Sequence, residues 1–254
     1  MKKSEFDYYN DLANWNFEDI KFVGETLTKW SYEDEIKKRV NENSKVLDLG
    51  TAAGEKVLKR FPECAEILGT DISPQMIHNA NLNLAKSGRK NIHFKVMDNL
   101  KMNTAENYYD VVTARHTVTD PKQIYKTLKK GGYILIRGVD KLDCWELKRK
   151  FNRGQAFYDK KPISLVDYEA VLDAGFKNVE LIPIHTVEYF ETKDDLYALL
   201  LKVPILINLS ELRNDEFEIV PIEKNIFEEY VKENTTEKGI KLIRRYYGIV
   251  GQKI

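Results

Sequence analysis

Apolar runs and helical patterns alternate through the middle of the chain. Two segments begin with an N-cap residue followed by proline, at Ser73-Pro74 and Asp120-Pro121, and continue at helical spacing to Gly88 and Gly131-Gly132. The runs around them are rich in β-branched residues and predict buried strands: "KVLDLG", "AEILGTDI", "NIHFKVMD", "YYDVVTAR" and "GGYILIRGV". This alternation predicts an α/β fold with parallel strands, helices on both faces, and a ligand at the carboxyl ends of the strands.

The two ends of the chain carry a different pattern. Residues 1–44 show no strand signal and predict an N-terminal helical cap, whose apolar stripe consists of Trp15, Phe22, Val23, Leu27 and Trp30. Residues 45–254 then form the main domain. After a predicted helix over residues 164–174, "KNVELIPIHTVEYF" and "GIKLIRRYYGIVGQK" predict two long strands, and the helical, irregular segment 192–236 between them is a predicted substrate lid.

A run of small residues follows the first of these strands. Asp48, Gly50, Ala52 and Gly54 form a D-x-G-x-A-x-G pattern, in which small side chains let the backbone turn sharply and approach a ligand. We expect Ala52 to keep a negative φ angle. The spacing differs from the G-x-G-x-x-G loop that binds pyrophosphate, and no Lys-Ser/Thr pair forms a P-loop. The loop therefore fits a ligand whose nearest part is not a phosphate.

Three loops together resemble the class I S-adenosylmethionine-dependent methyltransferases. The matching stretches are "VLDLGTAAG", "LGTDISP" and "VMDNL". The resemblance implies a Rossmann-like sheet of six parallel strands and one antiparallel strand, with S-adenosyl-L-methionine as the cofactor. It also implies the cofactor contacts: the amino-acid part at Asp48, Gly50, Thr51, Ala52 and Gly54, the ribose at Asp71 and Ile72, and the adenine at Asp98 and Asn99.

An Arg-His pair after the fourth strand supplies the candidate catalytic residues. The stretch "YYDVVTARHTVTD" is similar to a group of bacterial methyltransferases, in which this loop lies closest to the transferred methyl group. His116 can accept a proton from an oxygen or nitrogen nucleophile, or else pack under the cofactor and bond to the backbone. Arg115 can bind an anionic substrate or the cofactor carboxylate, or else form a structural salt bridge.

Four aromatic residues are candidate substrate contacts. Trp30 and Tyr32 precede the first core strand, and Tyr189 and Tyr197 begin the predicted lid. Packing in a core explains each of them as well. The "RRYY" stretch at 244–247 lies in a strand pattern and is weak evidence for nucleic-acid binding.

Composition narrows the classes of partner. The 254 residues contain 40 Lys and Arg against 40 Asp and Glu, so the whole chain has no excess positive charge for nucleic acid or anionic membranes. Cys64 and Cys144 lie far apart without metal-ligand spacing, which predicts no metal site. The start of the sequence has no apolar core of a secretion signal, and the most apolar window, 199–207, is short of a membrane span, so we expect a cytoplasmic monomer or homodimer.

Three functions fit this sequence. The first is methyl transfer to a small molecule by in-line displacement, which depends mainly on alignment and exclusion of water. The second is methylation of rRNA or tRNA, which uses the same cofactor site but favours a basic face. The third is a non-catalytic sensor or scaffold that binds the cofactor, because an alanine replaces the second glycine of the loop. Cofactor binding and turnover distinguish these functions.

Overall fold

The computed structural model describes residues 2–3, 8, 17–210, 212 and 217–254, so the predicted role of Trp15 lies outside the described residues. The chain divides into two compact units. The first contains Met1–Lys29, Val139–Ile163 and Pro183–Tyr246, and the second contains Trp30–Gly138, Ser164–Ile182 and Tyr247–Ile254. Within the described ranges, no helix has the length and apolar character that a membrane crossing requires.

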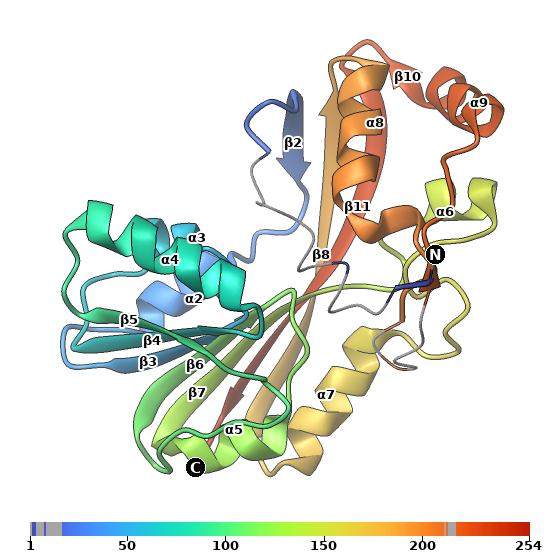
Figure 1. Cartoon of the computed structure of the whole chain (residues 1–254). Helices are drawn as coiled ribbons and strands as arrows, with labels where there is room; N and C mark the ends of the chain where they lie inside the picture. The colour runs from blue at the N-terminus through green and yellow to red at the C-terminus, as the bar shows by residue number, and fades with distance from the viewer. Residues whose placement is uncertain (1, 4–7, 9–16, 211, 213–216) are drawn as a thin grey trace. The chain divides into compact units, whose positions relative to one another are not determined.

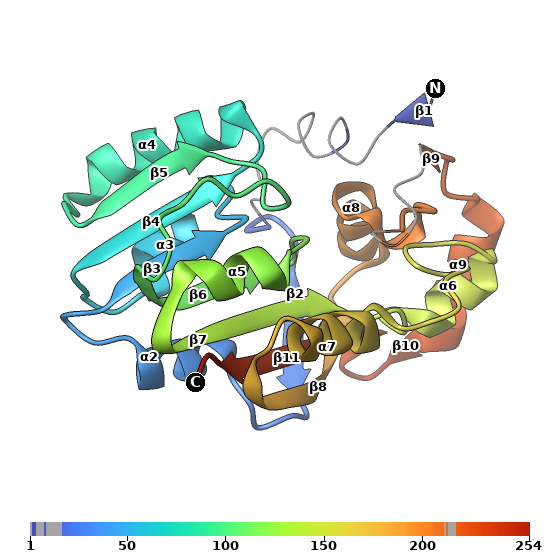
Figure 2. The same ribbon diagram turned by 90° about the horizontal axis from the view of Figure 1, so that it is seen from below.

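The strands of the main sheet lie in the order β2-β8-β11-β7-β6-β3-β4-β5, in which β2 covers Phe22–Thr26 and β10 (Thr235–Thr236) lies beside β11. The pairs β3–β4, β3–β6, β4–β5 and β6–β7 are parallel. These strands lie side by side in Figures 1 and 2. The seven predicted strands are β3 (Lys45–Leu49), β4 (Glu66–Asp71), β5 (Ile92–Val96), β6 (Tyr109–Arg115), β7 (Leu128–Val139), β8 (Lys177–Phe190) and β11 (Gly239–Gln252). The mixed α/β, Rossmann-like sheet is confirmed.

Strand β11 is antiparallel to its neighbour β7. The Gly131 amide donates to the Lys253 carbonyl at 2.6 Å, and the Asp140 amide donates to the Arg245 carbonyl at 3.0 Å. The residue number falls along β11 as it rises along β7, so the two strands run in opposite directions. The predicted antiparallel strand is therefore present beside the parallel ones.

The helices of the second unit cover both faces of its strands (Figure 1). Consecutive residues in a strand face opposite sides of a sheet, so the contacts of Ile134 and Leu135 in β7 show what covers each face. Leu135 belongs to a buried cluster with residues of α2 (Tyr32–Arg39) and α3 (Glu55–Arg60). Ile134 lies near Val171 of α7 (Ile163–Asp173), around Gly251.

Two predicted helix starts are confirmed. Helix α4 (Pro74–Ser87) has the Ser73 side chain accepting from the Met76 amide, and it ends at Gly88 with φ 71°. Helix α5 (Pro121–Thr127) is capped by Asp120. It ends before the predicted Gly131-Gly132, because residues 128–139 already belong to β7 and pair with β6.

The helical prediction for residues 1–44 is wrong for part of that segment. Phe22–Thr26 form strand β2, which pairs antiparallel with β8, whereas α2 is helical as predicted. The β8 edge supplies hydrogen-bond partners for the β2 backbone, and Phe22 packs on Phe190 with ring centroids 5.3 Å apart. With β2 and the short β10 added to the seven predicted strands, the sheet has nine strands among the described residues. The proposed boundary at residue 44 stays a prediction.

The first unit has its own core. It contains α6 (Trp145–Phe151), α8 (Lys193–Lys202), the 3-10 turn Pro204–Leu206, α9 (Lys224–Asn234), and the short pair β1 (Lys2–Lys3) and β9 (Phe217–Glu218). Side chains of α8 and α9 pack with β8 and β11 in one buried cluster. The described residues of segment 192–236 are thus mainly helical, as predicted, and contribute to this core.

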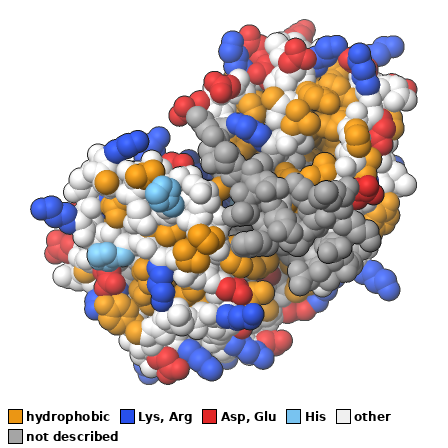
Figure 3. Space-filling view, viewed as in Figure 1, with side chains coloured by type: hydrophobic (Ala, Val, Ile, Leu, Met, Phe, Trp, Pro, Cys, Tyr) orange, Lys and Arg blue, Asp and Glu red, His pale blue; other side chains and the backbone are white. Residues whose placement is uncertain are grey.

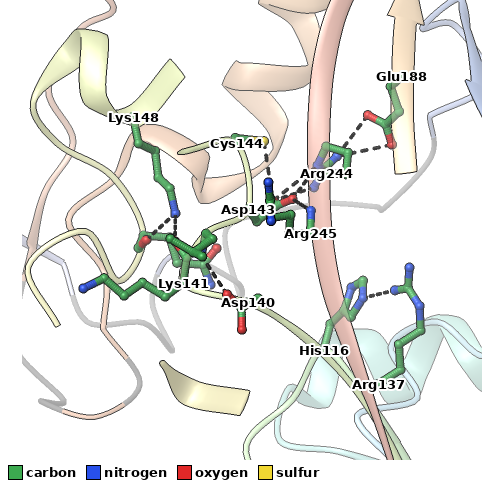
Figure 4. Close-up of polar contacts among 12 residues, drawn as sticks. His116, Arg137, Asp140, Lys141, Asp143, Cys144, Lys148, Glu188, Arg244 and Arg245 are labelled. Atoms are coloured by element: carbon green, nitrogen blue, oxygen red, sulfur yellow. Dashed lines mark hydrogen bonds and ion pairs between the residues drawn. The ribbon is translucent and has the colours of Figure 1, made fainter. Parts of the chain in front are cut away.

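Charged side chains are buried in the first unit in paired form (Figure 4). Arg244 donates to Asp143 at 3.0 Å and to Glu188 at 3.1 Å, and all three side chains are buried. Lys148 donates to the carbonyls of Lys141 and Gln155. Buried charges of this kind need such partners. Arg244 of the "RRYY" stretch is therefore held inside the unit by acids.

Candidate active site

The loop between β3 and α3 brings its two glycines against neighbouring side chains. Gly50 has φ 70°, and a Cβ there would lie 2.7 Å from Cβ of Thr117. Gly54 has φ 77°, and a Cβ there would lie 2.7 Å from the Phe94 ring. Only glycine satisfies both the left-handed backbone and the close packing at these positions. The turn predicted from sequence is present, and close packing against Thr117 and Phe94 requires its two glycines.

The expected negative φ of Ala52 is wrong. Ala52 has φ 49°, in the left-handed region. Its amide donates to Oδ2 of Asp71 at 2.9 Å. This hydrogen bond to the end of the neighbouring strand requires the loop to turn back, which accounts for the unfavourable backbone of an L-residue.

Asp71 holds the loop and the next helix start together. Its Oδ2 accepts the Ala52 amide, and its Oδ1 accepts the Ser73 amide at 2.9 Å. Burial raises the pKa of the Asp71 carboxyl, while the backbone amides of Ser73, Ala52 and Ile72 oppose that shift. Each carboxylate oxygen has a second lone pair, so this half-buried side chain can still accept ribose hydroxyls. The neighbouring Ile72 is 47% exposed and offers an apolar surface.

Asp48 lies inside the sheet. It is 7% exposed, and its Oδ1 accepts a hydrogen bond from Thr113 Oγ1 at 2.6 Å. Burial raises the pKa of Asp48 to about 6, and the hydrogen bond from Thr113 and the nearby Thr51 hydroxyl oppose the rise. Oγ1 of Thr51 lies near this carboxylate and is buried, but no hydrogen bond of normal geometry reaches it from the described residues. Asp48 is thus a buried residue of β3 that stabilises the start of the β3–α3 loop.

Asp98 and Asn99 have different neighbours. Oδ1 of the half-buried Asp98 accepts the Leu100 amide at 2.8 Å. Asn99 is buried, and its Nδ2 donates to Oγ1 of Thr117 at 2.9 Å and to the Val118 carbonyl at 3.3 Å. Asn99 therefore ties the loop after β5 to the loop after β6. Its Oδ1 is buried and has no hydrogen-bond partner in the described part of the chain.

His116, which directly follows β6, lies beside Arg137 of the neighbouring parallel strand β7 (Figure 4). The His116 amide donates to the Arg137 carbonyl at 2.8 Å, and Nε2 of the imidazole is hydrogen-bonded to Nη1 of Arg137. A guanidinium can only donate, so Nε2 accepts and the ring proton belongs on Nδ1. His116 is exposed and has φ 53°. The contact selects the unprotonated nitrogen that a general base needs.

Arg115 is directly opposite Arg137 in the pairing of β6 with β7. Its Nε is buried and has no hydrogen-bond partner among the described residues. Burial, followed by repulsion from Arg137 and Arg60, lowers the pKa of Arg115 to about 10. Glu33 also interacts electrostatically with Arg115, and the choice between an anion-binding role and a structural salt bridge stays a prediction.

Residues 40–200, more than half of the chain, match the family model described as a methyltransferase domain. The chain belongs to this methyltransferase family. It contains the class I S-adenosylmethionine-dependent methyltransferase domain that the sequence resemblance predicted.

Related proteins and structures agree with this assignment. The arsenite methyltransferase of Halobacterium salinarum is 29% identical over 150 residues, which are 54% of this chain and 38% of that protein. A protein-L-isoaspartate O-methyltransferase of Opitutus terrae is 24% identical over 99 residues, which are 39% and 42% of the two chains. This methyltransferase thus spans about two fifths of the length of the curated relatives it matches.

Solved structures share the fold at low sequence identity. The YcgJ protein of Bacillus subtilis has TM-score 0.54 and 15% identity, covering 87% of this chain and 97% of the other. Phosphoethanolamine N-methyltransferase 2 of Haemonchus contortus, solved with phosphomonomethylethanolamine and S-adenosylhomocysteine, has TM-score 0.51 and 18% identity, covering 88% and 52%.

The residues at the strand ends of the methyltransferase fit its cofactor. Asp71 and Asp98 keep free acceptor capacity for hydroxyl and amino hydrogens. The buried, unpartnered oxygens of Thr51 and Asn99 are further polar atoms near the same loops. Their positions agree with the three stretches that carried the sequence resemblance.

Two of the four aromatic candidates pack inside the second unit. Tyr32 is 5% exposed, and its hydroxyl donates to the Leu135 carbonyl at 3.5 Å. Trp30 packs against Gly248, where a Cβ would lie 2.5 Å from its ring. These contacts match the core-packing alternative.

The other two aromatic candidates belong to the first unit. Lys238 lies 5.4 Å from the Tyr189 ring, and Tyr197 packs on Phe227 at 5.3 Å. Their assignment to the substrate stays a prediction.

Sequence reasoning missed three residues of this site: Thr113, Thr117 and Arg137. Thr113 and Arg137 are interior positions of strand patterns, and Thr117 follows the Arg-His pair. A polar residue two positions before Arg115 was the available signal for Thr113. Arg137 becomes relevant only when β6 and β7 pair in the observed register.

The described residues contain no group of three or more candidate ligands that could hold a metal ion. Cys64 and Cys144 are both buried and free.

Proposed function

We propose that this enzyme transfers the methyl group of S-adenosylmethionine to a small molecule held at the carboxyl ends of β6 and β7. When bound, the cofactor supplies an electrophilic methyl on a positively charged sulfur. The protein must then orient the acceptor and exclude water. The observation that supports this site most strongly is the pairing of Arg115 with Arg137, which places His116 beside two cationic side chains.

The cofactor contacts form the first part of the proposal. Asp71 accepts the ribose hydroxyls with the lone pairs that the Ala52 and Ser73 amides leave available. Asp98 accepts the adenine amino hydrogens, and the exposed Ile72 packs on the base. The Gly50–Gly54 loop lies against the amino-acid part of the cofactor.

The acid-base role of His116 is the second part. Its hydrogen bond from Arg137 favours the neutral imidazole with an unprotonated Nε2. An acceptor that displaces the Arg137 N–H can transfer its own proton to Nε2 as its oxygen or nitrogen attacks the methyl group. This proton transfer is useful only for an acceptor that begins protonated.

Charge distribution favours a small molecule over RNA. On the face drawn in Figure 3, Lys and Arg side chains of described residues are interspersed with Asp and Glu. RNA-binding proteins concentrate positive charge in a patch or groove. The small compounds in the names of the arsenite and phosphoethanolamine methyltransferases agree with this class of acceptor.

The lid is a separate proposal. Side chains of α8 and α9 pack into the core of the first unit, so deleting residues 192–236 would disrupt that core. Replacing Tyr189 and Tyr197 by alanine one at a time is therefore the sharper test. Loss of transfer with unchanged cofactor affinity would support contact with the acceptor.

The experiment measures binding and transfer separately. Calorimetry with S-adenosylhomocysteine tests the cofactor site, and transfer of labelled methyl groups is then followed in a pool of small metabolites and in total RNA. Labelled small products support the proposal. Labelled RNA without small products would favour the RNA alternative, and cofactor binding without transfer to either pool would favour a sensor or scaffold.

A further inference from the structure

Basic side chains from two strands and one helix of the second unit converge around Arg115. Arg115 and Arg137 are register partners, and strand alternation places them on the same face as Val111 and Leu135, which α2 and α3 cover. Helix α3 adds Lys56 and Arg60. Arg137, Arg60 and Lys56 all interact electrostatically with Arg115 or with one another.

Acidic side chains offset only part of this charge. Glu33 interacts with Arg60, Arg115 and Arg137, and it is already ion-paired with Arg60. Asp48 interacts with Arg115 from a buried position, and its carboxylate already accepts a hydrogen bond from Thr113. Two carboxylates therefore face four basic groups among these described residues. Among the residues that the structure describes, basic groups therefore outnumber carboxylates around Arg115.

Arg115 is the group in this cluster with an unmet hydrogen-bond requirement. Its Nε is buried and unpartnered among the residues that the structure describes. A buried cationic donor without an acceptor costs free energy, which an anion that accepts its hydrogen bonds would offset. A guanidinium also matches the two oxygens of a carboxylate or phosphate.

The pKa of Lys56 is also affected by these neighbouring basic side chains. The residue is exposed as a whole, but desolvation of its ammonium group, together with repulsion from Arg115, Arg60 and Arg137, lowers its pKa to about 7. An anion bound in the cluster would stabilise the charged form of Lys56 and raise that pKa. Lys56 is therefore a reporter of occupancy.

The cofactor does not have the charge to satisfy this cluster. S-adenosylmethionine carries one carboxylate, one ammonium and one sulfonium, so its net charge is positive. We propose that Arg115, assisted by Lys56 and Arg60, binds an oxyanion of the methyl acceptor, a phosphate or a carboxylate group. This inference rests on the proposed function, and it narrows the acceptor to anionic small molecules.

The test uses the full chain and inorganic phosphate as the probe. Calorimetry of the protein saturated with S-adenosylhomocysteine should detect phosphate binding. Arg115→Gln should weaken that binding at least tenfold and change the S-adenosylhomocysteine affinity by less than twofold, and Arg115→Lys should restore part of the phosphate affinity. Lys59→Gln is the matched control, because Lys59 is an exposed residue of the same helix α3 and should leave both affinities unchanged.

Two further measurements identify the source of the anion. Nuclear magnetic resonance of labelled lysine should show the pKa of Lys56 rising when phosphate is added to the wild type but not to Arg115→Gln. Binding of 5′-methylthioadenosine, which lacks the amino-acid part of the cofactor, should equally survive Arg115→Gln.

Specific results would overturn the inference. If Arg115→Gln weakens S-adenosylhomocysteine but not 5′-methylthioadenosine, Arg115 binds the cofactor carboxylate and the acceptor assignment is wrong. Unchanged phosphate affinity in Arg115→Gln would also contradict it. A wild-type protein that binds phosphate but not S-adenosylhomocysteine would instead reject the proposed function and leave the anion site standing.

Discussion

Ala52→Gly should stabilise the protein, although it removes a side chain from a turn that is already rich in glycine. Ala52 has φ 49°, and a left-handed backbone costs an L-residue roughly 1–2 kcal/mol. Glycine removes that cost but loses about 0.5–1 kcal/mol through the greater freedom of its unfolded chain. The expected net gain is about 0.5–1 kcal/mol. Because the Ala52 amide keeps its bond to Asp71, cofactor affinity should not change.

Thermal unfolding followed by fluorescence measures this gain. For a chain of this size, 1 kcal/mol corresponds to a rise in Tm of roughly 2–4 °C. Ala53→Gly is the matched control, since Ala53 is buried and is not among the described residues with positive φ. It should lose about 1–2 kcal/mol.

Ala52→Val completes the comparison. A β-branched residue in the left-handed region should destabilise the loop by about 1–3 kcal/mol and weaken cofactor binding. A valine variant as stable as the wild type, or a glycine variant less stable than it, would refute the left-handed backbone at Ala52.

The remaining predictions concern three side chains of the site. Asp71→Asn should weaken S-adenosylhomocysteine binding by roughly 1.5–3 kcal/mol in calorimetry, the range for charge-assisted hydrogen bonds; wild-type affinity in a folded variant would contradict the ribose role. The folded pKa of Asp48 is raised to about 6, so its protonated form stabilises the fold at low pH and that contribution is lost as pH rises through about 6. Between about pH 4 and pH 6, the free energy of unfolding of the wild type, measured with urea, should fall by up to roughly 3 kcal/mol relative to Asp48→Asn. Parallel pH profiles of the two proteins would contradict the raised pKa of Asp48. His116→Asn should lower kcat by about 10²–10⁴ with unchanged cofactor affinity, and a rate within twofold of the wild type would exclude general-base catalysis.

Local sequence determined the framework and the cofactor-bearing loops. The cap residues Ser73 and Asp120 begin helices where predicted, because a side chain that caps its own backbone needs no distant partner. The same holds for the glycines of the β3–α3 turn, whose conformational freedom is a property of the residue itself. The apolar run before Asp71 is also a local pattern, and it correctly predicts a strand that ends at this residue.

Tertiary structure decided the features that depend on residues far apart in the sequence. Phe22–Thr26 forms a strand because its backbone pairs with the edge of β8, which lies more than 150 residues further along the chain. Ala52 took a left-handed backbone because its amide reaches Asp71 on the next strand. Arg115 and Arg137 became neighbours only through the register of β6 with β7, and no local pattern encodes that register. The positive charge around the proposed acceptor site therefore arises from long-range strand pairing, whereas the cofactor loop arises from local sequence.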